Sequence, residues 1–193
     1  MLEARELGCR RDGRSLFENL SFKVEVGQLW LVRGANGSGK TSLLRILAGL
    51  SPAEQGELIW QGEREPVLWV GHRVAVSAGL TARENLEFMA ALEGDEIGAS
   101  AAALEAVGLG AFSETRAGRL SEGQARRVAL ARLAFSTRRL WLLDEPLTSL
   151  DETSVNWFET QVHRQLDRGG AVVMATHREI SDSLQGWTLQ LGA

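Results

Sequence analysis

An eight-residue stretch, GANGSGKT from Gly34 to Thr41, combines the residue types that bind phosphate groups. Its spacing, G-x-x-x-x-G-K-T, predicts a loop whose backbone N–H groups surround nucleotide phosphates. Glycines suit such a loop because they lack a Cβ and adopt positive φ angles freely. We expect nucleotide binding by the loop and the residue after it: Gly34, Ala35, Asn36, Gly37, Ser38, Gly39, Lys40, Thr41 and Ser42.

Two side chains of this stretch have more specific expected roles. Lys40 is expected to reach the β- and γ-phosphates as a point charge and so to take part in catalysis. The Thr41 hydroxyl is expected to ligate Mg²⁺. Ser42 fits the exposed surface of the following helix better than a direct contact.

Two carboxylates and a histidine follow other apolar runs. LWLLDEP contains Asp144 and Glu145, and VVMATH ends in His177. The end of a buried strand is where open α/β sheets bind ligands. We expect Asp144 to hold Mg²⁺ through water, Glu145 to act as the general base, and His177 to align the attacking water, since a neutral imidazole has one donor and one acceptor. A simple helix cap and a structural histidine are the alternatives.

The phosphate loop requires a strand before it and a helix after it. Leu29 to Val32 is apolar, and Thr41 to Leu50 has helical spacing, so the context is right. Further strands are expected at 57–61, 66–70, 140–144 and 171–175, and helices at 81–92, 101–107, 121–135 and 152–167. Strands that alternate with helices predict an α/β fold with a parallel sheet.

Composition excludes several classes of function. The chain has 21 basic and 25 acidic residues, a net charge of −4, so no nucleic-acid partner is expected. Its single cysteine, Cys9, excludes an internal disulfide and favours a reducing compartment. Because no apolar run is long enough for a membrane span, we expect no direct span, and a membrane role would need another subunit.

A second motif distinguishes among nucleotide-binding families. LSEGQ, from Leu120 to Gln124, lies between GANGSGKT and the acidic pair, and SLD at 149–151 and His177 follow. In residue types and in order, these motifs resemble those of the ABC ATPase family. The resemblance covers almost the whole chain. The resemblance implies ATP hydrolysis with Mg²⁺. It also implies a single domain, 1–193, with a RecA-like α/β core, a mostly parallel sheet, an N-terminal antiparallel β region and a helical subdomain at about 74–118.

The same resemblance implies an ATP-dependent homodimer. In this family two subunits meet head to tail, and the signature of one closes over ATP held by the other. Ser121, Gly123 and Gln124 would then contact the partner's nucleotide, with Asp151 near the seam. A helix that begins at Ser121 would direct its partial positive charge at the γ-phosphate.

Two positions depart from the family pattern. Arg11 falls where the family carries an aromatic residue that stacks on adenine, and this chain has no tyrosine. Its guanidinium could stack on the base or remain solvated. His72 or Arg73 falls where the family has the glutamine that links Mg²⁺ to the membrane partner, which leaves coordination from that loop open.

Three stretches, LEARELGCRRDGRSLFENLSF, GHRVAVSAGLTARENLEF and GQARRVALARL, are similar to the ATP-binding subunits of cytochrome c maturation complexes. This implies an integral membrane ABC partner, a peripheral position at the cytoplasmic face of the bacterial inner membrane, and the handling of haem or its chaperone. The alternatives are another small exporter, a soluble ABC ATPase outside transport, and a nucleotide-binding regulator with little turnover.

Overall fold

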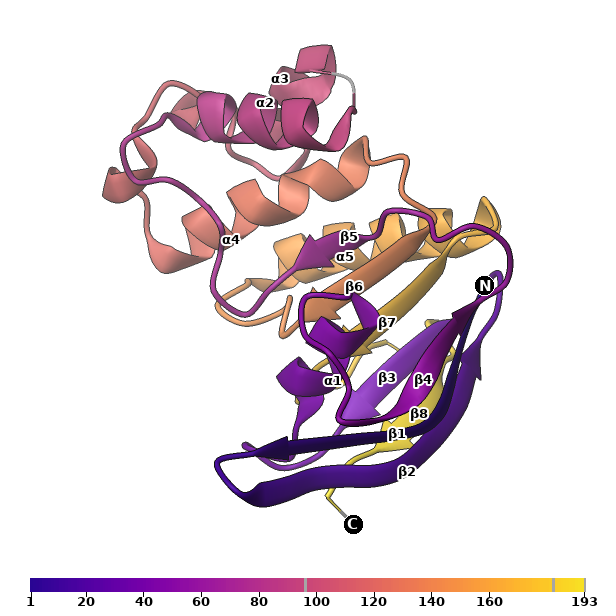
Figure 1. Cartoon of the computed structure of the whole chain (residues 1–193). Helices are drawn as coiled ribbons and strands as arrows, with labels where there is room; N and C mark the ends of the chain where they lie inside the picture. The colour runs from indigo at the N-terminus through magenta and orange to yellow at the C-terminus, as the bar shows by residue number, and fades with distance from the viewer. Residues whose placement is uncertain (96, 182, 193) are drawn as a thin grey trace. The chain divides into compact units, whose positions relative to one another are not determined.

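The computed structural model describes residues 1–95, 97–181 and 183–192 (Figure 1). The contacts divide the chain into two units, each assembled from segments that are distant in the sequence. The first comprises Met1–His72, Arg138–Glu145 and the residues from His163 onward; the second comprises Arg73–Thr137 and Pro146–Val162.

An antiparallel sheet of the first unit has the order β2-β1-β4 and contains β1 (Leu2–Arg11), β2 (Arg14–Val24) and β4 (Gln55–Trp60). β1 and β2 form a hairpin around Asp12 and Gly13, whose φ angles of 52° and 76° are both positive, as in a type I′ turn. Leu2 pairs with Val24 on one side and with Trp60 on the other. The predicted N-terminal antiparallel region is confirmed.

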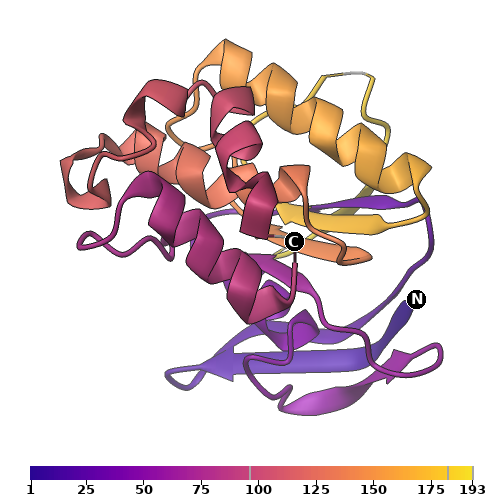
Figure 2. The ribbon, with the colours of Figure 1, turned by 90° about the horizontal axis from the view of Figure 1, so that it is seen from above.

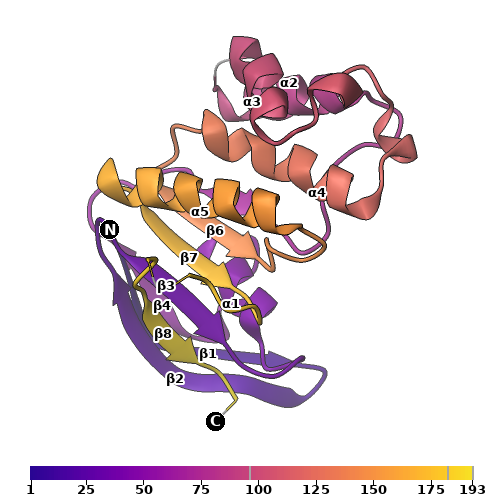
Figure 3. The same ribbon diagram turned by 180° about the vertical axis from the view of Figure 1, so that it is seen from behind.

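A parallel sheet of the same unit has the order β5-β6-β7-β3-β8. Its strands are β3 (Leu29–Arg33), β5 (Leu68–Val70), β6 (Leu140–Asp144), β7 (Ala171–Ala175) and β8 (Trp187–Gln190). All neighbours run parallel, and the arrows of β3, β6 and β7 point the same way in Figure 3. The predicted α/β class is confirmed, whereas β8 was missed because its mostly exposed side chains lack a buried-strand pattern.

The core of the first unit joins the two sheets through α1 (Lys40–Leu47). Leu43, Leu44 and Leu47 on this helix are completely buried. They share one apolar cluster with Leu7 of β1 and Leu142 of β6. The helix that follows the phosphate loop is therefore held by both sheets, which fixes the position of its first turn.

The second unit is helical and has its own apolar cluster, which includes Leu86, Leu104 and Val128. α2, α3 and α4 pack against one another (Figure 2). Among the described residues, no helix is long and apolar enough to cross a membrane. The bounds are α2 (Ala82–Glu93), α3 (Ser100–Ala106), α4 (Glu122–Ala131) and α5 (Glu152–Asp167), whose last residues belong to the first unit, with 3₁₀ helices η1 (Ile97–Ala99), η2 (Gly110–Phe112), η3 (Ala117–Arg119) and η4 (Arg132–Ala134).

Two helices are shorter than the sequence predicts. α1 ends at Leu47 rather than Leu50 because Gly49 adopts a φ of 69° and ends the helix. α4 ends at Ala131, and the predicted continuation to Phe135 is the 3₁₀ turn η4. The boundaries expected for a helical subdomain, 74–118, remain a prediction.

Candidate active site

The loop between β3 and α1 depends on glycine at three positions. Gly34, Gly37 and Gly39 have φ angles of 148°, 81° and 102°, which favour glycine. A Cβ on Gly34 would lie 2.5 Å from Ser38 Oγ and 2.6 Å from the carbonyl oxygen of Leu191. A Cβ on Gly37 would meet nothing within 4 Å, so conformation alone requires glycine there. The backbone of this loop can therefore approach a ligand closely.

Lys40 is the first residue of α1 and is only 7% exposed. Its Nζ donates to the carbonyl oxygens of Gly34 and Ala35 at 2.9 and 3.2 Å, and it lies 2.9 Å from Nε2 of His177. An ammonium has three N–H donors, so these acceptors account for all of them. A phosphate oxygen that binds Lys40 would replace one of these acceptors.

Thr41 and Asp144 meet although they are 103 residues apart in the sequence. The Thr41 hydroxyl donates to Asp144 Oδ2 over 2.8 Å. Asp144 is the last residue of β6 and is 1% exposed, so its carboxylate is held by the buried strand. The pair presents oxygen atoms of the kind that hard divalent cations prefer.

Glu145 follows β6 with a positive φ of 51°, and its N–H donates to the Ala175 carbonyl at the end of β7. Its Oε2 accepts from the backbone N–H of His177 at 3.3 Å. Nε2 of His177 lies 3.3 Å from Glu145 Oε1, but 2.9 Å from the Lys40 ammonium. Because Nε2 cannot both accept from Lys40 and donate to Glu145, the shorter contact assigns a neutral ring with its proton on Nδ1. Glu145 Oε1 is then buried without a hydrogen-bond donor.

These groups line one cavity of about 300 Å³ at the carboxyl ends of the parallel strands. Most of the predicted site residues are brought together there: Arg11, Asn36, Gly37, Gly39, Lys40, Thr41, Ser42, Asp144, Glu145 and His177. Gly34 and Ala35 instead hold Lys40 by their carbonyl groups, and the Ser38 N–H donates to Ala35. Leu16 and His72 complete the lining, whereas Arg73 belongs to the second unit.

Arg33, at the end of β3, is a site residue that the sequence motifs did not reveal. Its Nη1 donates to the carbonyl oxygens of Thr176 and Arg178, each at 2.9 Å. These two residues flank His177, so Arg33 fixes the backbone that carries the imidazole. Its position next to Gly34 is the only signal in the sequence, and that signal is weak.

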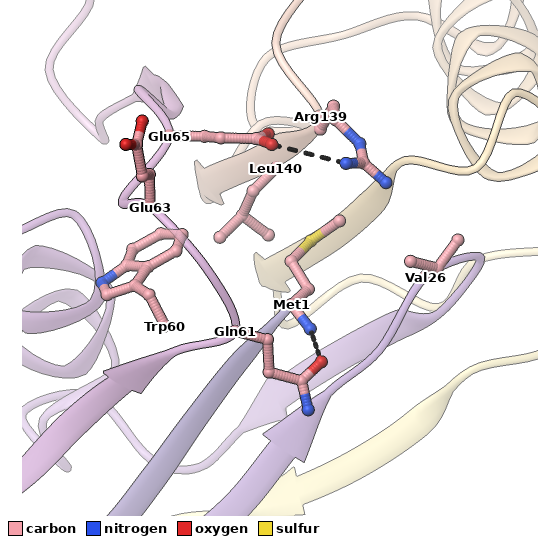
Figure 4. Close-up of a pocket in the computed structure, with 8 residues that line it drawn as sticks. All are labelled: Met1, Val26, Trp60, Gln61, Glu63, Glu65, Arg139 and Leu140. Carbon is pink, nitrogen blue, oxygen red and sulfur yellow. Dashed lines mark hydrogen bonds and ion pairs between the residues drawn. The ribbon is translucent and has the colours of Figure 1, made fainter.

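A second cavity, of about 170 Å³, lies at the opposite end of β6 and is lined by Arg139 and Leu140 (Figure 4). Two pairs of its polar groups bond each other. The Met1 ammonium donates to Gln61 Oε1 at 2.5 Å, and Arg139 lies 3.4 Å from Glu65. Burial lowers the pKa of the Met1 amine. The described lining residues of this cavity include none of the predicted site residues.

The signature residues belong to the second unit, where the structure gives them local contacts. Ser121 caps α4: its hydroxyl accepts from the Gln124 N–H at 3.2 Å, and Gln124 Oε1 accepts from the Ser121 N–H at 2.8 Å. A Cβ on Gly123 would lie 2.6 Å from the carbonyl oxygen of Ser149. Asp151 accepts from the Ser154 N–H at 2.8 Å, and hydrogen bonds from the Ser154 hydroxyl and backbone lower the Asp151 pKa.

A glycine loop between a strand and a helix, with a buried lysine, an acidic pair at the end of β6 and a histidine after the neighbouring β7, defines a P-loop nucleotide-binding protein. The family profile described as "ABC transporter" matches residues 17–148. The cytochrome c biogenesis ATP-binding export protein CcmA of Hahella chejuensis is 43% identical over 100% of this chain and 96% of its own length. The CcmA protein of Photobacterium profundum is 40% identical over the full length of both chains.

The chain belongs to the ABC transporter family and, within it, to the cytochrome c biogenesis ATP-binding export proteins. It is an ATP-binding protein and an ATPase, as the sequence predicts. Among solved structures, a putative ABC transporter ATP-binding protein from Pyrococcus furiosus has a TM-score of 0.83 at 26% identity, covering 98% of this chain and 96% of that one. A dimeric ATP-binding cassette bound to ADP and Pi has a TM-score of 0.80 at 21% identity, covering 92% and 88%, and so shows the fold alone.

Proposed function

We propose that this chain is the energy-coupling ATPase subunit of a membrane ABC complex for c-type cytochrome biogenesis, a complex that handles haem or its chaperone. The observation that carries the catalytic part is the meeting of the phosphate loop, the Thr41–Asp144 pair, Glu145 and His177 at one cavity. The reaction converts ATP and water into ADP and phosphate. The names of the relatives support the cellular role.

Phosphate binding rests on the loop and on Lys40. The N-terminal end of α1 directs N–H groups and a partial positive charge toward the cavity, which favours an anion. Lys40 is held there by the loop carbonyls of Gly34 and Ala35, so its charge is in place before the substrate arrives. A preorganised cation costs little reorganisation when the transferred phosphoryl group gains charge.

The Thr41–Asp144 pair fits a divalent cation. Both oxygen atoms belong to residues that line the cavity, they lie 2.8 Å apart, and Asp144 is buried at a fixed strand end. We propose that Thr41 ligates Mg²⁺ and that Asp144 holds it through water. Bound Mg²⁺ would neutralise charge on the phosphate oxygens. His72 also lines the cavity and offers a ring nitrogen where the family carries an amide.

Glu145 has the properties of a general base. Glu145 lines the cavity, and its Oε1 accepts no hydrogen bond, so this carboxylate is the group proposed to take the proton of the attacking water once the nucleotide is bound. His177 donates its backbone N–H to the other carboxylate oxygen and thereby orients the Glu145 carboxylate. The neutral imidazole that the Lys40 contact assigns can align the water and bond the γ-phosphate.

We also propose an ATP-dependent homodimer. The capping box of α4 engages the N–H groups of Ser121 and Gln124, which leaves the first-turn N–H groups of Glu122 and Gly123 for an anion. The close approach of Gly123 to the Ser149 carbonyl allows no larger residue there. In the dimer, Ser121, Gly123 and Gln124 would cover ATP bound by the second copy, with Asp151 near the seam.

Light scattering tests the dimer. Glu145→Gln protein should retain ATP and run as a dimer with ATP and as a monomer without it. Adding Ser121→Arg should prevent the dimer, because a bulky cation then replaces the serine that caps the N-terminus of α4. Ser183→Arg, on an exposed serine of the first unit, serves as the control and should leave the dimer intact. A Ser121→Arg double variant that still dimerises on ATP would refute the signature as the covering element.

The cellular role has a separate test. A bacterium that lacks its own cytochrome c biogenesis ATP-binding protein should regain haem-stained c-type cytochromes with the wild-type gene and not with Glu145→Gln. The wild-type protein should be recovered in the membrane fraction with an integral membrane ABC subunit, at the cytoplasmic face of the inner membrane. An active purified ATPase that restores no cytochromes would favour another small exporter, or an ABC ATPase outside transport if it also stays off the membrane.

A further inference from the structure

Ser149, in the segment that connects β6 to α5, has a rare backbone conformation. Its φ angle is 61°, in the left-handed region that residues with a side chain seldom adopt. Its hydroxyl donates to Glu122 Oε1 at 3.1 Å, and its carbonyl oxygen lies 2.6 Å from the place that a Cβ would take on Gly123. A strained residue persists only where its surroundings hold it. Ser149 is thus anchored to the signature by two separate contacts, both inside the second unit.

The same segment is also fixed to the first turn of α5. The Asp151 carboxylate accepts from the Ser154 N–H at 2.8 Å, and the Asp151 carbonyl accepts from the Val155 N–H at 3.0 Å. These bonds tie the segment to the beginning of a 16-residue helix. The Ser149 hydroxyl therefore offers Glu122 a supported donor, in contrast to a side chain on a free loop.

Glu122 is the first residue of α4, and its charge has two opposite consequences there. A carboxylate in the first turn stabilises a helix, because it lies near the positive end of the macrodipole. The same end of α4 is where the proposed dimer brings the γ-phosphate of ATP bound by the second copy. Because like charges repel, the signature carries an acid close to the place where an anion must arrive.

We propose that Ser149 is a positioning residue for the signature: its hydroxyl holds the Glu122 carboxylate in place and so keeps the N–H groups of Glu122 and Gly123 open to phosphate. The proposal rests on the proposed function, because only the ATP-bound dimer brings a phosphate to α4. Once the bond is lost, the carboxylate turns freely and competes with the phosphate for the positive end of the helix. The Ser149–Glu122 bond thus lowers the ATP concentration that closes the dimer.

Light scattering during an ATP titration tests the proposal, with Glu145→Gln as the parent so that ATP persists. Ser149→Gly removes the donor, yet glycine adopts the φ of 61° freely. It should raise the ATP concentration at half-dimerisation by about threefold to tenfold, the net strength of one hydrogen bond. Ser149→Asn keeps a donor and tolerates the left-handed conformation, so it should restore most of this loss. Equal losses in the two variants would overturn the role of the hydroxyl.

A matched control removes the same kind of bond elsewhere in the second unit. Ser113 donates to Glu114 Oε1 at 3.3 Å, and Ser113→Gly should shift the midpoint by less than about twofold. ADP, which lacks the γ-phosphate, should bind every variant with unchanged affinity, because the phosphate loop belongs to the first unit. A midpoint in Ser113→Gly that moves as far as in Ser149→Gly would overturn the specific role of Ser149.

A double-mutant cycle with Glu122→Gln distinguishes positioning of the carboxylate from a purely structural role. Glu122→Gln should lower the ATP midpoint by about threefold, since it removes the repulsion. In that background Ser149→Gly should shift the midpoint by less than about twofold, because the charge that the serine positions is gone. Glu105→Gln neutralises an exposed acid of α3 and should leave the midpoint unchanged. A full Ser149→Gly effect without the Glu122 charge would overturn the proposal.

Ionic strength gives a readout that a structural role would not move. The loss caused by Ser149→Gly should shrink as potassium chloride is added, because salt screens the released carboxylate. A loss that is independent of salt would overturn the proposal. If the parent dimerises with ATP and Ser149→Gly leaves its midpoint unchanged, the positioning role is wrong and the dimer stands. If the parent binds ATP in a direct titration but stays monomeric, the proposed dimer fails, and this inference fails with it.

Discussion

The two ends of strand β6 carry cavities of opposite character within the same unit. At the amino end, Arg139 and Leu140 line a cavity in which Met1 bonds Gln61 and Arg139 pairs with Glu65. At the carboxyl end, Asp144 and Glu145 line a cavity with Lys40 and His177. Both contain ions of both signs, yet only one has the arrangement of an active site.

The difference lies in what holds the charged groups. Arg139 and Glu65 are each more than half exposed and are held by one another, so solvent screens them. Lys40 is buried and held by loop carbonyls, and Asp144 is held by a buried strand. Backbone and strand thus position charges that face a cavity, while one carboxylate oxygen of Glu145 has no donor. Support from the backbone, more than the presence of charge, therefore marks the reactive end of β6.

Glu145→Gln should have the largest effect. An amide cannot accept the proton of the attacking water, so turnover should fall by about 10² to 10⁴ while ATP still binds. Glu65→Gln makes the same chemical change at the amino end of β6 and should leave turnover unaltered. Phosphate release and nucleotide titration measure the two quantities. Wild-type turnover in Glu145→Gln would remove Glu145 as the base.

Lys40→Ala should reduce ATP affinity by about a hundredfold, because it removes charge-assisted hydrogen bonds to phosphate. Arg139→Ala removes a cation from the other cavity and should change ATP affinity by less than about twofold, since exposed ion pairs contribute little. Isothermal titration of both variants with ATP decides the matter. Equal losses in the two variants would show that general positive charge, and not a positioned lysine, binds the nucleotide.

Arg33→Leu should lower kcat by about tenfold and leave KM nearly unchanged, because the arginine acts on the His177 backbone and not on the ground-state nucleotide. Arg33→Lys restores one donor and should recover part of the rate. A rise in KM that matches the fall in kcat/KM would contradict this positioning role. Far-UV circular dichroism of each variant checks that the fold survives.

The smallest expected effect is on stability, and it concerns the Met1 amine in the cavity at the amino end of β6. Burial favours the neutral form of the Met1 amine, so its pKa in the folded protein lies below the value in the unfolded chain. The unfolded chain then binds more protons between these two pKa values, and stability should rise slightly with pH through that window. Urea unfolding at several pH values measures the trend. ATP turnover should not depend on this amine, and a turnover profile that follows it would contradict the separation of the two ends.

Local sequence was enough to predict the phosphate loop, its strand and helix, and the acidic strand end. The required signals are short range: the glycines at positions 37 and 39, helical spacing in α1, and a continuous apolar run in β6. The structure gives these two glycines φ angles of 81° and 102°, which favour glycine. The signature LSEGQ and the order of motifs also predicted the family, which the relatives confirm. The predicted ends of the helices were wrong by a few residues, as at α1, because a residue that ends a helix, such as Gly49, acts over only one turn.

Only the tertiary structure decided how these residues meet. The bond between Thr41 and Asp144 spans 103 residues. It depends on the sheet order, in which β7 lies between β3 and β6, and no local pattern specifies that order. The same holds for Arg33, whose two carbonyl acceptors lie more than 140 residues away. Sequence determines which groups are able to do chemistry, since that depends on residue type. Distance, burial and protonation depend on packing between remote segments, and so only the fold settles them.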